Sequence, residues 1–235
     1  MTAAEILADL KKNGSESIKK VLVKHGAKEP FYGVKVEYLK VLRKKLNANH
    51  ALALELFDSG ISDAMYLAGL ISEPEKFTKA QLQKWAKAAH WSLISESTVG
   101  ACAAESPHAR ELAQSWINSP KENVATAGWT TLSQYVALTP DDDLDMAEVQ
   151  GLLAKVVQEI ASKPNRVRYC MNGFVISVGC YVLPLVKEAK ATAKAISPVQ
   201  VDMGDTACKV PDAVEYIEKV EAMGRLGRKK KEARC

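Results

Sequence analysis

The sequence has little that would build a β-sheet or a membrane span. Only 6% of its 235 residues are aromatic although 47% are hydrophobic, a balance typical of Ala- and Leu-rich helices and unlike that of a β-sandwich. No run approaches the roughly 20 apolar residues that cross a bilayer, and residues 1–13 are typical of an amphipathic helix, not of a secretion signal. Five scattered cysteines fit reduced thiols, so we expect a cytoplasmic protein.

The motifs of common enzyme and metal-binding classes are also absent. The sequence has no phosphate-binding glycine loop, HExxH, CxxC or GxSxG, and its four histidines are dispersed. The acidic run TPDDDLD at 139–145 could bind Mg²⁺, but its place before a predicted helix favours helix capping. We therefore expect neither a metal nor a cofactor.

The formal net charge of +4 is concentrated at the C-terminus. Residues 224–235 hold six basic residues and one acidic residue, whereas residues 1–223 hold 26 basic and 27 acidic residues. We expect this tail, made mobile by its two glycines, to contact phosphates in a salt-dependent way; a solvated terminus is the alternative. The chain is thus predicted to have a helical domain over 1–223 and a basic tail over 224–235.

Hydrophobic periodicity predicts helices along the whole chain, separated by proline and glycine. The predicted ranges are 3–12, 17–24, 32–46, 51–57, 62–71, 79–89, 93–104, 109–117, 123–137, 146–160, 166–182, 185–195 and 213–223. Prolines divide them into pairs with a spacing near the ~40–47 residues of HEAT-type repeats. We therefore predict an all-α, curved solenoid of antiparallel helix pairs, with a concave face suited to a long partner. A compact irregular bundle is the alternative.

The tryptophans divide into core candidates and one site candidate. Trp85, Trp116 and Trp129 lie at helical spacings that favour the core. Trp91 follows His90 at a predicted helix junction, where an indole can stack on a base or a sugar, or pack in the core.

Two C-terminal segments could contact a ligand. Arg166 and Arg168, near the start of a predicted helix, can reach phosphates or pair with nearby acids. Gly173 weakens this helix, which indicates close approach of another backbone. The connection 199–211, which contains Lys209, is long for an ordered loop, and such loops often carry function; a loop that only attaches the last helix to the solenoid is the favoured alternative.

Several segments together resemble the AlkD-like DNA alkylation repair family, the HEAT-like repeat DNA glycosylases. They are FYGVKVEYLKVLRKKL at 31–46, HW at 90–91, WINSPKENVATAGW at 116–129, VRYCMNGFVISVGCYV at 167–182 and the ending that starts TACKVPD at 206. The resemblance implies a HEAT-like solenoid that holds duplex DNA in a basic concave groove. In active members it implies release of cationic N3- or N7-alkylpurines, with aromatic faces and a carboxylate stabilising the cationic sugar.

At the family's catalytic positions, this sequence departs from the family pattern. Trp91 matches the family's first tryptophan, but Ser95 occupies the position of the aspartate, with Glu96 next to it. Thr126 occupies the position of the arginine, and Phe174 that of the second tryptophan. Either Glu96 substitutes through a one-residue shift in the helix, or the protein keeps the DNA-binding form without this chemistry.

Three functions follow as expectations. The first is a monomeric protein that binds double-stranded DNA, with glycosylase activity that uses Trp91 and Phe174 as aromatic walls and Glu96 as the carboxylate. The second is a silent relative that binds distorted or branched DNA, and the third is a protein-binding scaffold. The expected DNA contacts are Arg43, Lys44, Arg166, Arg168, Asn172, Lys209, Arg225, Arg228, Lys229, Lys230 and Lys231.

Overall fold

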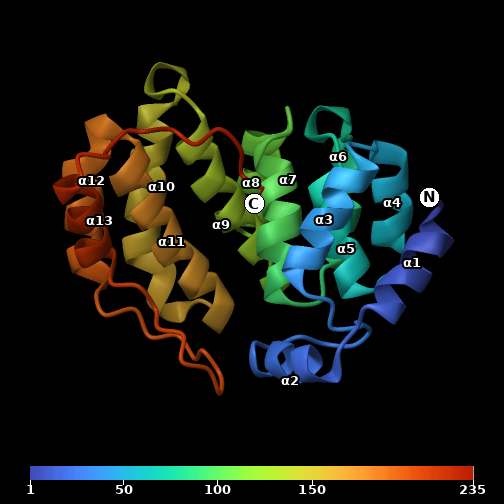
Figure 1. Ribbon diagram of the computed structural model, residues 1–235. Coiled ribbons are helices and arrows are strands. Elements are labelled where there is room, and N and C mark those ends of the chain that lie inside the picture. Colours follow the sequence, from blue (N-terminus) through green and yellow to red (C-terminus); the bar gives the residue numbers. More distant parts are fainter. Residues whose placement is uncertain (235) are drawn as a thin grey trace.

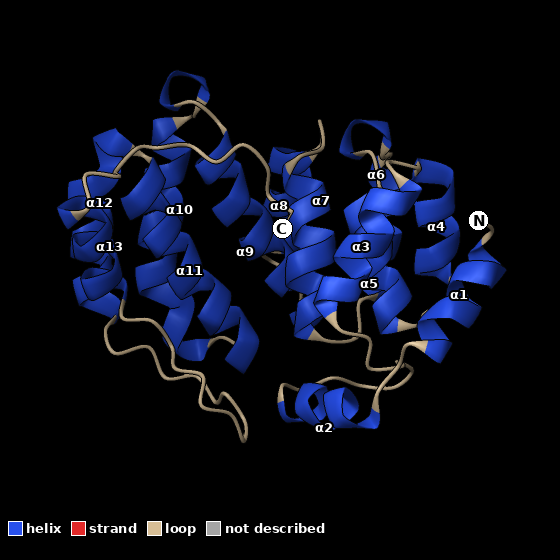
Figure 2. Cartoon of the chain, viewed as in Figure 1, coloured by secondary structure: helices blue, strands red, loops and turns tan. Residues whose placement is uncertain are grey.

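The computed structural model describes residues 1–234, and it arranges them as a curved stack of helices (Figure 1). Within these residues no strand is present (Figure 2), in agreement with the predicted all-α class. The α-helices are α1 (Ala3–Lys12), α2 (Glu16–Lys24), α3 (Val36–Leu46), α4 (His50–Asp58), α5 (Ser62–Ile71), α6 (Lys79–Ala88), α7 (Ala101–Ala104), α8 (Ala109–Trp116), α9 (Glu122–Leu138), α10 (Met146–Glu159), α11 (Asn165–Tyr181), α12 (Val186–Ile196) and α13 (Ala213–Ala222). A π-helix, Ile94–Gly100, leads directly into α7.

The helices pack in pairs, and the pairs stack along the chain. α4 packs on α5, α8 on α9, and α11 on α12. A second set of contacts joins the pairs, from α5 to the π-helix, from the π-helix to α9, and from α9 to α11. We call α5, the π-helix with α7, α9 and α11 the central row. This stack of helix pairs is the predicted solenoid.

Large apolar side chains fill the space between the layers. Trp85 is 1% exposed and stacks on Phe57, with ring centroids 3.9 Å apart. Trp129 is fully buried against Phe174 at 5.4 Å. Burial of an aromatic side chain removes 150–250 Å² from water, so these residues dominate the core energetics. The predicted core positions of the three tryptophans are confirmed, since Trp116 is also 1% exposed.

Two predicted helices differ from the structure for local reasons. The helix predicted from residue 32 begins at Val36, because the Asp63 carboxylate accepts hydrogen bonds from the backbone N–H of Tyr32 (2.6 Å) and of Val34 (2.8 Å). These bonds hold the segment extended against the start of α5. The helix predicted over 93–104 is split into the π-helix and α7. Such π segments are frequent at functional sites.

Among residues 1–234, no single helix is both long enough and apolar enough to cross a membrane. The pair Asn165–Tyr181 and Leu183–Ile196 reaches that length and composition only together, across a bend of 114°.

Candidate functional site

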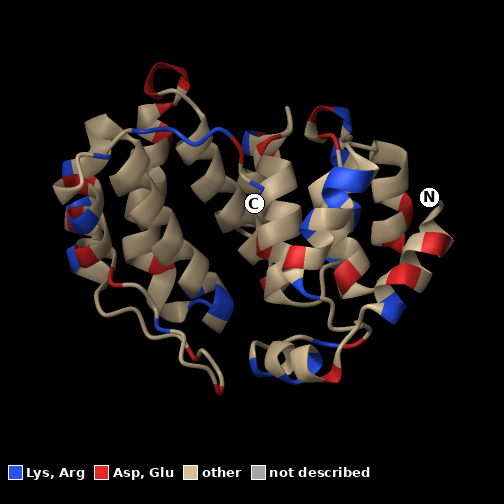
Figure 3. Cartoon of the chain, viewed as in Figure 1, with Lys and Arg blue, Asp and Glu red and all other residues tan. Residues whose placement is uncertain are grey.

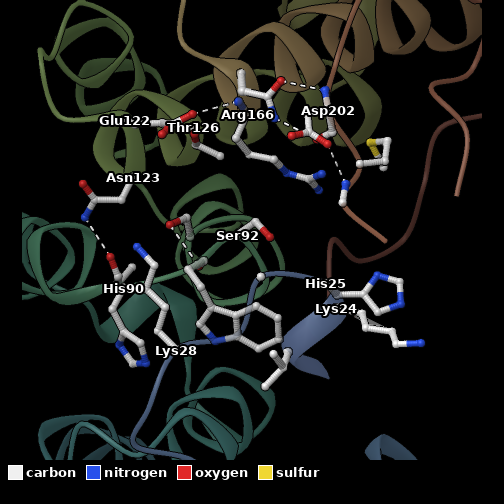
Figure 4. A pocket seen from close by; sticks show the side chains of 18 of the residues that line it. Lys24, His25, Lys28, His90, Ser92, Glu122, Asn123, Thr126, Arg166 and Asp202 are labelled. Carbon is white, nitrogen blue, oxygen red and sulfur yellow. Dashed lines mark hydrogen bonds between the residues drawn. The ribbon is translucent and has the colours of Figure 1, made fainter. Parts of the chain in front are cut away.

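A cleft of about 1090 Å³ opens at the N-terminal ends of the central row (Figure 4). Five segments form its walls. They are the end of α2 with the turn after it, the junction between α6 and the π-helix, the start of α9, the start of α11, and the loop 202–205. Because the helices of the central row run in the same direction, the positive ends of the α9 and α11 dipoles face this cleft.

Hydrogen bonds between neighbouring segments hold the cleft walls together. The Asn123 side chain donates to the carbonyl oxygens of Ala86 (2.9 Å) and Ala89 (2.8 Å), which joins the end of α6 to the start of α9. The backbone N–H of Arg166 donates to Glu122 Oε1 at 2.8 Å, which joins the start of α11 to that of α9. Polar groups at three helix ends are thereby satisfied within the protein.

Trp91 lines the cleft but is largely buried. It is 7% exposed, and its indole N–H donates to Ser62 Oγ at 3.1 Å. Ser62 Oγ also lies 2.8 Å from His90 Nε2. The indole is therefore fixed by the start of α5, and only a small part of its surface can meet a ligand.

Two of the other three family positions lie in the same cleft as Trp91. Ser95 and Thr126 both line it, and each is 1% exposed. Phe174 does not: it is fully buried in the core against Trp129. The expectation that Phe174 forms an aromatic wall is therefore corrected, because its ring has no surface that a sugar could contact.

Glu96 is placed by the π-helix and held by Arg166. Arg166 Nε lies 2.5 Å from Glu96 Oε1 and Arg166 Nη2 lies 2.8 Å from Oε2, a bidentate ion pair. The guanidinium also lies 4.0 Å from the ring centre of Tyr169. Burial raises the pKa of the Glu96 carboxyl above its ordinary value, while Arg166 acts in the opposite direction. Glu96, the expected catalytic carboxylate, is therefore one side of an ion pair between the π-helix and α11.

The connection 199–211 forms the far wall of the cleft. Asn165 and Asp202 exchange two hydrogen bonds of 2.8 Å, so the loop is fixed to the start of α11. At Gly204, which has φ +64°, a β-carbon would lie 2.8 Å from the Lys24 carbonyl oxygen. The loop and the end of α2 therefore meet across the mouth of the cleft.

The other predicted contacts in this part of the chain have different surroundings. Arg168 Nη2 donates to Asn165 Oδ1 at 3.4 Å and is partly buried. Asn172 is 1% exposed and donates to the Pro211 carbonyl at 2.9 Å, so its expected contact with DNA is corrected. Lys209 is exposed on the loop. A β-carbon at Gly173 would meet nothing within 4 Å, so the predicted close approach by another part of the chain is wrong.

The basic tail is packed along the opposite ends of the central row (Figure 3). Gly227 N–H donates to the Cys180 carbonyl at the end of α11. Lys229 donates to the Val136 carbonyl of α9 at 2.9 Å and pairs with Asp141 at 2.8 Å. Cations near the carbonyl end of a helix offset its negative dipole end. The expected mobility is thus corrected for residues 224–234.

Arg234 ends this run in a socket between α7 and α5. It pairs with Glu105 at 2.8 Å and donates to the carbonyls of Gly69 (3.1 Å) and Ser72 (2.8 Å). Its side chain is 12% exposed and that of Glu105 is 14% exposed. The tail therefore touches the C-terminal ends of all four helices in the central row.

The tail cations divide into two sets. Lys229 and Arg234 are engaged with the protein, and Lys230 donates to Gln134 at 3.0 Å. Arg225, Arg228 and Lys231 are exposed.

Two cations of α3 lie beside the tail. Arg43 contacts Glu232 at 3.3 Å, and Lys44 beside it is exposed. Arg43 and Lys44 thus lie beside the tail, whereas Arg166 and Arg168 lie at the cleft end, so these four expected DNA contacts do not share one face.

The sequence did not identify the contribution of α2 to the cleft. Lys24, His25 and Lys28 line it, opposite Arg166 and Asp202 (Figure 4). The basic side chains Lys24, Lys28 and Arg166 are matched in number by the acidic lining residues Glu122, Asp202 and Asp205. The cleft is therefore nearly balanced in charge, unlike the strongly basic groove that the family resemblance implied.

The acidic run at 139–145 has structural roles. Asp145 caps α10 by accepting a hydrogen bond from the Glu148 N–H at 3.1 Å. Asp141 pairs with Lys229 and accepts from the Leu183 N–H at 3.1 Å. In the part of the chain that the structure describes, no three His, Cys, Asp or Glu side chains are grouped as ligands for a metal ion.

Comparison with known proteins agrees with this architecture. The sequence pattern of the DNA alkylation repair enzyme family matches residues 6–217. An uncharacterized protein of Listeria innocua is 37% identical over 206 residues, covering 85% of this chain and 88% of the relative. One of Listeria monocytogenes is 36% identical over the same length and shares of both chains.

A solved structure matches the whole chain. It is described as a new family of proteins related to the HEAT-like repeat DNA glycosylases with affinity for branched DNA structures. The two chains are 31% identical, the match covers 100% of each, and the TM-score is 0.90. The predicted HEAT-like solenoid is confirmed.

Proposed function

Because the chain belongs to the DNA alkylation repair enzyme family, we propose that it binds DNA at the cleft without excising an alkylated base. The preferred DNA would be branched or distorted, as the affinity of the similar solved protein for branched DNA supports. The protein would act as a cytoplasmic monomer, and the unpaired state of Cys102, Cys170, Cys180 and Cys208 fits a reducing compartment.

The bidentate ion pair between Glu96 and Arg166 is the main support for binding without base excision. Excision of an alkylpurine needs a negative charge beside the sugar as positive charge develops there. At Ser95 the neutral hydroxyl cannot supply that charge, and it lies 3.3 Å from the Trp91 carbonyl, to which it donates. The Glu96 charge is already compensated by a guanidinium. The cleft therefore lacks a free carboxylate at the position where the chemistry would need one.

Binding has support from the groups that remain. The N-termini of α9 and α11 point their positive dipole ends at the cleft, and such ends favour phosphate. Lys24 and Lys28 line the opposite wall. The lining acids Glu122 and Asp202 accept hydrogen bonds from the backbone N–H groups of Arg166 and Gly204, which fixes them within the walls of the cleft.

Near balance of charge fits a preference for branched over linear DNA. A strongly basic groove binds any duplex through its phosphates. A cleft with matched charges gains less from phosphate contacts alone and depends more on shape and on the exposed bases or sugars of a junction. Trp91 supplies a small aromatic surface for such a contact.

A second candidate is a glycosylase for cationic N3- or N7-alkylpurines, and the π-helix favours it. A π-helix carries an extra residue relative to an α-helix, and this one spans Glu96, which is the one-residue shift that would bring Glu96 to the family's acidic position. In that reaction Glu96 would have to leave Arg166 and face the sugar. A third candidate, a protein-binding scaffold, predicts no DNA affinity at physiological salt.

One pair of assays separates the three. The purified protein is titrated by fluorescence anisotropy with a four-way junction and with linear duplex of one arm, and is then incubated with methylated DNA. We expect tighter binding of the junction and no release of 3-methyladenine or 7-methylguanine. Release that the Glu96→Gln substitution abolishes would establish the glycosylase instead. Failure to bind either DNA would favour the scaffold.

A further inference from the structure

The exposed cations of the tail lie on a segment that starts at the end of α11 and ends beside the basic helix α3. Arg228 and Lys231 are exposed, and the Arg43–Glu232 contact brings the end of the tail to α3. Lys40 and Lys44 are exposed on α3 and lie four residues apart, so they share one face of the helix. We call Lys40, Lys44, Arg228 and Lys231 the strap surface. Figure 3 shows the blue tail running across the molecule toward α3.

Three acids beside the tail are paired with cations that do not belong to the strap surface. Asp141 is paired with Lys229, Glu105 with Arg234, and Glu232 with Arg43. Within residues 1–234, no residue of the strap surface forms an ion pair. The tail thus contributes inward cations that attach it and outward cations that are free for a partner.

The strap surface is also preorganised. The tail backbone is fixed by Gly227 N–H to Cys180 O at 2.9 Å and by Lys230 N–H to Ala137 O at 2.8 Å. A partner therefore does not have to order this segment, and ordering a mobile tail would subtract from the affinity. An extended row of fixed cations suits a polymer with regularly spaced negative charge, and duplex DNA carries one charge per ~1.7 Å of its axis.

The strap surface and the cleft lie at opposite ends of the same helices. α9 has 17 residues and so spans about 25 Å. Its first residues line the cleft, whereas Val136 and Ala137 near its end bind the tail. Two DNA segments could therefore be held at once, one at each end of the central row.

We propose that the strap surface is a second DNA-binding site, which takes one duplex arm of a branched DNA while the cleft holds the branch point. This inference rests on the proposed function and adds the surface that distinguishes a branched DNA from a single duplex. A linear duplex meets one surface, and a junction meets both.

The test compares two triple variants of the full chain with equal change of charge. Lys44→Ala/Arg228→Ala/Lys231→Ala removes three cations of the strap surface. Lys187→Ala/Lys194→Ala/Lys219→Ala removes three exposed lysines of α12 and α13 and serves as the control. Affinity for a four-way junction and for a linear duplex of one arm is measured by anisotropy between 50 and 200 mM salt.

We expect the strap variant to bind the junction roughly tenfold more weakly or worse, and to lower the salt slope by about 2.7, which is 0.9 for each of three phosphates. Duplex affinity should fall by a smaller factor, because a linear duplex can still bind at the cleft, and the control should change neither. Both triple variants should unfold at the wild-type temperature, since none of the six side chains forms an ion pair within residues 1–234.

Two results would overturn the inference while the proposed function survives. One is equal loss for the two triple variants, which would mean a general charge effect. The other is equal loss of duplex and junction affinity in the strap variant, which would mean one shared surface. The inference would also be overturned if the strap variant lost affinity for an acidic polypeptide but kept its affinity for the junction. Wild-type protein that binds neither DNA would instead refute the proposed function.

Discussion

The two ends of the central row use the same helix dipoles in opposite ways. At the C-terminal ends, the carbonyls of α5, α9 and α11 are covered by the chain's own tail, with Lys229 and Arg234 as the cations. At the N-terminal ends of α9 and α11, the positive dipole ends face an open cleft. The protein thus neutralises its negative helix ends internally, whereas its positive ends open onto the cleft, where Glu122 already accepts a hydrogen bond from the first turn of α11.

This contrast shows that the cations behind the net charge of +4 have different roles. The basic residues of the tail are the whole of the formal excess, yet two of the six are engaged in ion pairs with the body of the protein. Some cations of this basic segment therefore stabilise the fold, and others remain exposed for binding.

The Arg234 socket should contribute most to stability. Replacing Arg234 by Ala leaves Glu105 and the carbonyls of Gly69 and Ser72 without their partner. Breaking a buried pair from one side costs about 3–5 kcal/mol, and we expect about 3 kcal/mol in urea unfolding because the pair is slightly exposed. The control is Arg225→Ala, an exposed tail cation, which should change stability by less than about 0.5 kcal/mol. Similar values for the two variants would mean that the tail is not attached through Arg234.

The second prediction concerns the charge of the cleft. Glu96→Gln keeps a hydrogen-bonding side chain beside Arg166 but removes the opposing charge, so the guanidinium becomes available to phosphate. One added charged contact should tighten DNA binding by roughly tenfold and steepen the salt slope by about 0.9. Anisotropy titrations check this. Weaker binding by the Glu96→Gln protein would show that the pair itself, not the free arginine, forms the DNA contact.

The third prediction uses two glycines that have open space around them. A β-carbon at Gly173 in α11 or at Gly151 in α10 would meet nothing within 4 Å. Alanine at either position should raise stability by up to about 1 kcal/mol, because it limits the unfolded chain and favours the helix. Gly173 lies seven residues after Arg166 and therefore on the same face of α11. If DNA lies along this face, the methyl group added by Gly173→Ala crowds it, so we expect this variant, and not Gly151→Ala, to weaken DNA binding. Equal affinity of the two variants for a junction would place the DNA away from this face.

The smallest expected effect is on pH dependence. The pKa of Glu96 is raised by burial, so protons bind to this carboxyl at a higher pH than to an ordinary glutamate. As pH falls toward that raised pKa, Glu96 becomes neutral and Arg166 is freed, so DNA binding should tighten in the same direction as in Glu96→Gln but by less. The Glu96→Gln protein should lack this dependence. Identical pH profiles for the wild type and the variant would exclude Glu96 as its source.

Much of the fold could be predicted from local patterns. Apolar spacing and proline placement locate the helices to within a few residues, because each helix buries one face. The start of α3 could not be predicted, since it depends on Asp63, about thirty residues away. The π-helix was not predicted, although a one-residue shift near Glu96 was one of the two alternatives that the resemblance left open.

The candidate site was predictable only in part. Trp91, Ser95 and Thr126 are brought together as the resemblance implied. The partners of the charged residues could not be predicted, because Glu96 and Arg166 are 70 residues apart and Arg234 and Glu105 are 129 apart. Composition gives the number of cations, and only the tertiary structure decides which of them remain free.

Amide hydrogen exchange with and without a four-way junction locates the bound DNA on the protein. We expect slower exchange on binding in segments 24–28, 89–96, 122–126 and 165–166, which surround the cleft. We expect no change in α8, α10 and α12 away from the tail. Unchanged exchange around the cleft, with protection confined to those three helices, would show that DNA does not bind at the cleft.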